Sequence, residues 1–79
     1  MRFYLITIQY NAEAGAENRS VPKAFDSLDD AFAEFHSQVS KDMRNATLGW
    51  SLNMIVNSEG GTYEKYTEKW TRENEPIGE

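Results

Sequence analysis

The chain has 79 residues, of which 39% are hydrophobic and 27% charged, and its 13 acidic and 8 basic side chains give a net charge of -5. This length fits one small domain, and the negative charge disfavours direct binding to nucleic acid or to anionic membranes. The lack of cysteine excludes disulfides, thiol nucleophiles and Cys-based zinc sites, while a single histidine excludes His-pair metal sites. We therefore expect no cofactor, no metal and no enzymatic activity.

A β-strand is predicted over residues 3–10, where most side chains are β-branched or aromatic. Phe3 and Leu5 point to one side of this strand and Tyr4 and Ile6 to the other, so both sides are apolar at its start. An uncharged segment of this kind aggregates when it lies on an open edge. We therefore expect the strand to be central or covered.

The following segment, residues 11–18, is small and polar around Gly15 and predicts a surface loop. Residues 20–25 predict a short returning strand. Pro22 has no N–H to give to a strand ladder, which places this strand at an edge of the sheet.

A helix is predicted over residues 28–44, with Ser27 capping its first amides. Asp29 and Asp30 suit its positively polarised start, and Asn45 suits a left-handed exit. The apolar side chains recur every three or four residues and form one stripe: Leu28, Ala31, Phe32, Phe35, Val39 and Met43.

Residues 49–57 alternate between apolar and polar side chains and predict a strand with one buried side. The apolar side, expected to face the helix, carries Trp50, Leu52, Met54 and Val56. Ile55 is the apolar exception on the other side, and residues 57–61 predict a hairpin turn.

The segment 62–71 is open to two interpretations. Tyr63, Tyr66 and Trp70 fit helical spacing, but three threonines and three aromatic residues favour a strand with a bulge between Tyr63 and Tyr66. We prefer the strand because the preceding hairpin turn needs a partner. Residues 72–79 are acidic with little to bury and predict a frayed tail, so the single domain is expected to span residues 1–71.

This order of elements predicts an α+β domain, in which one helix packs on one face of a three- or four-stranded, mostly antiparallel sheet. The face away from the helix is expected to expose apolar side chains at Phe3, Leu5, Ile55 and Tyr63. Because large exposed apolar patches mark interfaces, the sequence predicts an interaction module that self-associates as a twofold homodimer. One alternative is that a loop or the tail folds over this face, and a weaker one, opposed by the acidic surface, is that single-stranded nucleic acid stacks on its aromatic side chains.

The side chains that could carry chemistry are isolated from one another. His36 has no metal ligand four residues before or after it, and we interpret it as a partly packed helix histidine near the edge of the core. Ser27 lacks a histidine–acid constellation, and Asp29 and Asp30 diverge by about 100° around the helix, too far to act as a carboxylate pair. No catalytic residue and no metal site are predicted.

The carboxylates near the helix start support a second hypothesis. Asp26, Asp29, Asp30 and Glu34 would imitate phosphates and occupy the basic nucleic-acid-binding groove of an unidentified host protein. An enzyme ranks last, because a domain this small would need a pocket formed between subunits.

Two stretches, NATLGWSLNM (residues 45–54) and KWTRE (residues 69–73), resemble short uncharacterised proteins encoded in prophages and conjugative elements of gut Gram-positive bacteria. The resemblance runs over most of the chain. It implies an origin in a mobile genetic element and names no activity. The sequence shows no secretory signal and no run of apolar residues long enough to span a membrane, so a cytoplasmic location is expected.

Overall fold

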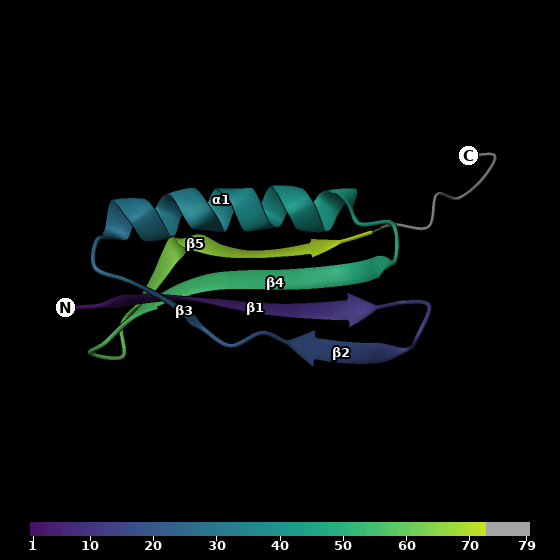
Figure 1. Ribbon diagram of the computed structural model, residues 1–79, viewed down its shortest axis with the longest axis horizontal. Coiled ribbons are helices and arrows are strands. Elements are labelled where there is room, and N and C mark those ends of the chain that lie inside the picture. The colour runs from purple at the N-terminus through teal and green to yellow at the C-terminus, as the bar shows by residue number, and fades with distance from the viewer. Residues whose placement is uncertain (73–79) are drawn as a thin grey trace.

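The computed structural model describes residues 1–72 and shows one helix packed on an antiparallel sheet of five strands (Figure 1). The elements follow in the order β1 (Phe3–Asn11), β2 (Ala16–Arg19), β3 (Lys23–Phe25), α1 (Leu28–Arg44), β4 (Leu48–Asn57) and β5 (Thr62–Thr71). The α+β class is confirmed. The sheet has five strands because β2 and β3 both pair with β1, one after the other along the same edge.

The two long strands β1 and β4 form the centre of the sheet, whose order is β2-β1-β4-β5. They pair antiparallel along nearly their whole length, from Phe3 opposite Asn57 to Tyr10 opposite Trp50. The prediction that the first strand is central is confirmed. The edge strand expected over residues 20–25 is present in part, as β3, which covers only Lys23–Phe25.

The prediction of a loop over residues 11–18 is wrong, because most of this segment belongs to a β-hairpin. β1 continues to Asn11, and residues 16–19 return beside it as β2. The side-chain Oδ1 of Asn11 accepts hydrogen bonds from the amides of Glu13 and Ala14 and closes the turn. Gly15, at φ 67°, supplies the left-handed conformation that this turn requires.

The helix begins as the sequence predicts, with Ser27 Oγ accepting a hydrogen bond from the Asp30 amide at 3.1 Å. Its sheet-facing side buries Ala31 and Phe35 completely. Near its end the predicted apolar stripe is wrong, because Met43 is 49% exposed and Asp42 is buried instead.

The end of the helix also differs from the prediction. Asn45 has φ -87° and ψ 107°, so the exit is extended rather than left-handed. Arg72 satisfies backbone carbonyls at and just after the helix end: its guanidinium donates to the carbonyls of Met43 and Asn45 and to that of Leu48, the first residue of β4. Arg72 therefore belongs to the folded domain, and the rest of the predicted tail, residues 73–79, lies outside the described residues.

β5 is a strand with an interruption where the sequence predicts a bulge. Val56 is opposite Thr62 and Met54 is opposite Thr67, so the four residues from Tyr63 to Tyr66 share the space across from Ile55. This extra length allows both tyrosine rings to pack against the core on the helix side.

Candidate functional site

The four residues predicted on the open face, Phe3, Leu5, Ile55 and Tyr63, lie on the face that the helix covers. Leu5 and Ile55 are paired across β1 and β4 and are buried against Phe35 of the helix. Phe3 and Tyr63 pack at the margin of the same core, with ring centroids 6.2 Å apart. The predicted face is therefore the wrong one, and these residues form the core and its margin.

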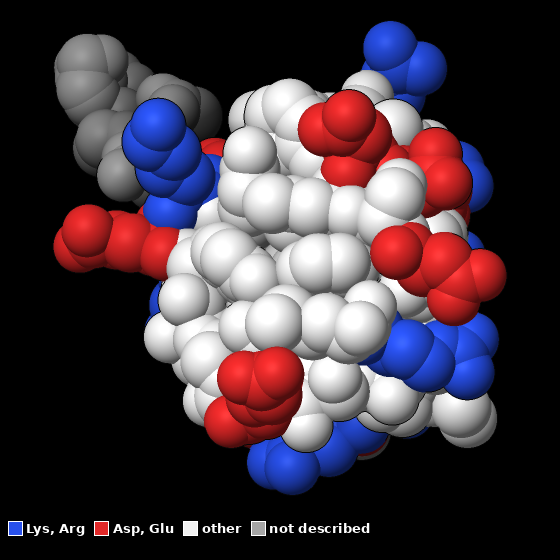
Figure 2. Space-filling model, turned by 90° about the vertical axis from the view of Figure 1, so that its left-hand side faces the viewer, with Lys and Arg blue, Asp and Glu red and all other residues white. Residues whose placement is uncertain are grey.

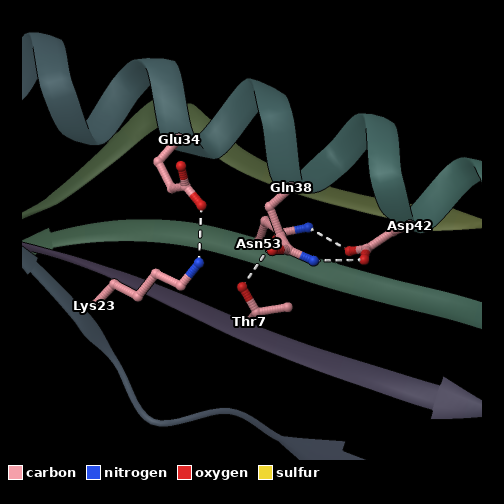
Figure 3. Close-up of polar contacts among 6 residues, drawn as sticks. All are labelled: Thr7, Lys23, Glu34, Gln38, Asp42 and Asn53. Atoms are coloured by element: carbon pink, nitrogen blue, oxygen red, sulfur yellow. Dashed lines mark hydrogen bonds and ion pairs between the residues drawn. The ribbon is translucent and has the colours of Figure 1, made fainter.

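A buried polar network on the helix side explains this reversal (Figure 3). The carboxylate of Asp42 accepts hydrogen bonds from Gln9 Nε2 at 2.7 Å, Gln38 Nε2 at 2.9 Å and Asn53 Nδ2 at 2.9 Å. Asn53 Oδ1 in turn accepts from the hydroxyl of Thr7 at 2.7 Å. The polar side chains of the two central strands thus face the helix and not the solvent.

Asp42 lies in the last turn of the helix, where the helix dipole disfavours a negative charge. Only 1% of this residue is exposed, so the three amide donors must replace the water that the carboxylate has lost. Because side chains alternate along a strand, turning Thr7 and Asn53 toward Asp42 turns their apolar neighbours to the opposite face.

We expect Asp42→Asn to lower the free energy of unfolding by about 2 kcal/mol, because the substituted amide places an N–H group where a charged acceptor stood. Urea denaturation measures this change. Asp29→Asn is the control, since Asp29 is an exposed aspartate on the same helix, and it is expected to cost a few tenths of a kcal/mol. Equal effects at the two positions would show that the network contributes no net stability.

The face of the sheet away from the helix is apolar along its whole centre, and we call it the open face. It is formed by alternate residues of β1 and β4: Tyr4, Ile6, Ile8, Tyr10, Trp50, Leu52, Met54 and Val56. Each of these side chains is half-buried. Among residues 1–72 no helix or strand packs over them, since α1 lies on the opposite side of the sheet (Figure 1). An uncovered apolar surface of this kind is typical of an interface.

One end of the open face carries a fixed aromatic pair. The rings of Tyr10 and Trp50 are stacked, with centroids 5.9 Å apart and planes 4° from parallel. Lys69 Nζ lies 4.9 Å from the Trp50 ring centroid, within the range of a cation–π interaction. Gly49 makes room for the pair, because a Cβ there would lie 3.0 Å from the Tyr10 ring. Rigid aromatic side chains bind a partner with little loss of conformational entropy.

The predicted acidic site is partly neutralised by cations of the same chain. Asp26 Oδ1 lies 3.5 Å from Arg2 Nε, and Glu34 Oε2 accepts a hydrogen bond from Lys23 Nζ at 2.8 Å (Figure 3). Asp29 and Asp30 are exposed at the helix start. Figure 2, which views the molecule from the end where the helix begins, shows acidic groups interspersed with basic and uncharged surface. The four carboxylates therefore do not form one unpaired acidic surface.

The hydrogen bond from Lys23 lowers the pKa of Glu34 below its ordinary value. The ion pair therefore adds stability above the unfolded pKa of about 4.3 and loses it as the pH falls through the lower folded pKa. We expect Glu34→Gln to cost about 0.5 kcal/mol at pH 7 and nothing in strong acid. Thermal unfolding at pH 7 and pH 3 measures this, with Glu64→Gln as the exposed control. A cost that is the same at both pH values would contradict the assignment.

The described part of the chain contains no pocket and no cluster of His, Asp and Glu side chains that could hold a metal ion. The ring of His36 packs on that of Phe32, with centroids 4.2 Å apart. No helix within residues 1–72 has both the length and the apolar character needed to cross a membrane. Comparison of the chain with protein-family models, curated proteins and solved structures gave no match. The open face is thus the feature on which a function can be argued.

Proposed function

We propose that this protein is a non-enzymatic interaction module that forms a homodimer through the open face. The observation that carries the proposal is the continuous apolar surface of β1 and β4, whose side chains pair directly across the two strands, for example Ile6 with Met54 and Ile8 with Leu52. Each pair remains half-exposed in a single chain. Burial against a second copy removes this apolar surface from water.

The open face, together with the borders that β2 and β5 add on the same side of the sheet, approaches the size of a stable dimer interface. The two strands of nine to ten residues that carry the open face cover about 30 Å by about 10 Å, or about 300 Å² per copy, and the whole sheet surface with its polar borders on β2 and β5 covers about 600 Å². Side-chain relief adds to this area, and the standard interface buries about 800 Å² per partner. Two such sheets packed face to face, about 10 Å apart, form a β-sandwich.

The position of the apolar residues also indicates how association occurs. β1 and β4 are central strands whose backbone groups are already paired on both sides over most of their length. A partner therefore contacts side chains and does not extend the sheet at these strands. Tryptophan, tyrosine and methionine, which are enriched in interface cores, make up half of the open face.

Sedimentation equilibrium of the full chain tests the proposal. We expect a mass about twice the 9.1 kDa of one chain at micromolar concentration, with dissociation on dilution. A mass of one chain at every concentration up to about 1 mM would overturn the proposal, because a Kd above about 1 mM corresponds to a binding free energy of less than about 4 kcal/mol.

The other expectations stay predictions from the sequence. The acidic alternative retains Asp29 and Asp30 as its exposed carboxylates, while a partner would have to displace Arg2 and Lys23 to reach the others. An origin in a mobile genetic element and a cytoplasmic location also stay predictions.

A further inference from the structure

We infer that the two copies meet about a twofold axis that runs along the strands, between β1 and β4, and that Lys69 of each copy faces Glu17 of the other. This inference rests on the proposed self-association and adds the orientation of the partner. Charged side chains on β2 and β5 border the open face and determine this orientation.

The negative charge of this border lies on β2. Glu17 pairs with Tyr10 and Arg19 pairs with Ile8, so both side chains lie on the open face beside the apolar residues. The Glu17 carboxylate is 3.7 Å from the Arg19 guanidinium, and the side chains of Glu17 and Arg19 are 47% and 73% exposed. We call a line of paired side chains that runs across the strands a row. Glu17 lies at the outer end of the row that contains Tyr10 and Trp50.

The positive charge on the opposite border reaches the same row. Lys69 of β5 pairs with Leu52, one row away, but its ammonium leans toward the Trp50 ring. The Glu17 carboxylate therefore lies at one end of the row of Tyr10 and Trp50, and the Lys69 ammonium lies beside Trp50 at the other end, where Thr71 is the β5 residue of the row. Opposite charges at the two ends of one row make the face self-complementary under a suitable twofold rotation.

A twofold rotation about an axis along the strands brings the opposite charges of the two copies together. It places β1 over the β4 of the other copy and β2 over its β5, and it keeps each row opposite the same row. Tyr10 of each copy then lies opposite Trp50 of the other. Glu17 of each copy lies opposite Lys69 of the other, so this contact forms twice in each dimer. Arg19 and Lys69 end the same row, that of Ile8 and Leu52, so they approach each other across the dimer. The Glu17 carboxylate, already in contact with Arg19, lies between these two cations.

A twofold axis that runs across the strands does not bring these opposite charges together. That rotation places β2 over β2 and β5 over β5 with the rows in reverse order. Lys69 would then lie over the part of β5 that contains Thr62, and Glu17 would lie near Ala24 of β3. Charge complementarity therefore selects the axis along the strands.

Charge reversal tests this orientation. Glu17→Lys and Lys69→Glu each place like charges together twice per dimer, and we expect each to raise the dimer Kd at least about tenfold. The double variant Glu17→Lys/Lys69→Glu restores both pairs and is expected to return to within about threefold of the original Kd. Sedimentation equilibrium gives the three values, and Glu59→Lys and Lys41→Glu are the controls for charge change away from the open face.

A mixture of the two single variants gives the sharpest result. With one variant labelled with ¹⁵N, native mass spectrometry should show heterodimers in excess over both homodimers, because only the mixed pair carries opposite charges at both contacts. A statistical mixture with unchanged Kd values would overturn the orientation and leave self-association standing. A monomeric original chain would overturn the proposed function and this inference together.

Discussion

The substitution Leu52→Glu is expected to convert the dimer into a folded monomer. Leu52 lies at the middle of the open face, opposite Ile8, and a dimer buries it twice. Loss of about 2 kcal/mol per buried leucine, taken twice, raises the Kd about 1,000-fold, and desolvation of the new carboxylate adds to this. Sedimentation equilibrium measures the Kd, and circular dichroism shows whether the monomer keeps its fold.

Val21→Glu is the matched control, because it makes the same kind of change at a residue that is 84% exposed outside the open face. Its Kd should stay within about twofold of the original. Ile8→Thr, which keeps a β-branched residue in the strand, should weaken the dimer in the same direction without adding charge. Equal dimer affinities for Leu52→Glu and Val21→Glu would show that the open face is not the contact surface.

In the core between the helix and the sheet, Phe35→Ala is expected to lower the free energy of unfolding by about 4 kcal/mol. Phe35 is 1% exposed and packs against Leu5 and Ile55 of the sheet and against the ring of Tyr66. Its removal leaves a cavity that these neighbours fill only in part. Urea denaturation at one fixed protein concentration gives the change, because dimerisation makes apparent stability depend on concentration.

Phe32→Ala serves as the comparison, since Phe32 belongs to the same helix but is half-buried. We expect about half the loss at this position, in proportion to the smaller apolar area removed from water. A loss at Phe35 no larger than that at Phe32 would mean that the helix does not close the core as described.

Local signals in the sequence were sufficient to predict most of the elements. The cap at Ser27 and the spacing of apolar residues gave the helix its observed limits, residues 28–44. The bulge between Tyr63 and Tyr66 followed from aromatic and threonine content. The prediction of a loop over residues 11–18 is wrong because every residue of the second strand, Ala16–Arg19, is exposed, so the strand carries no apolar alternation.

The candidate surface was harder to predict because alternation shows which residues share a face but not which face meets the helix. The prediction turned the more apolar set of β4, including Trp50 and Leu52, toward the helix. The structure turns Asn53 there instead, because Asp42 offers a buried acceptor. A buried aspartate in the last helical turn depends on partners distant in sequence, such as Gln9, and no local pattern reveals it.

Isotope-filtered NMR on a mixture of methyl-labelled and unlabelled chains would identify what covers the open face. Contacts between two chains at Ile6, Ile8, Leu52 and Val56 are expected, and the methyl groups of Leu5 and Ile55 should show contacts within one chain alone. Complete absence of contacts between chains, at a concentration of about 1 mM where weak dimers form, would contradict the proposal that a second copy packs on this surface.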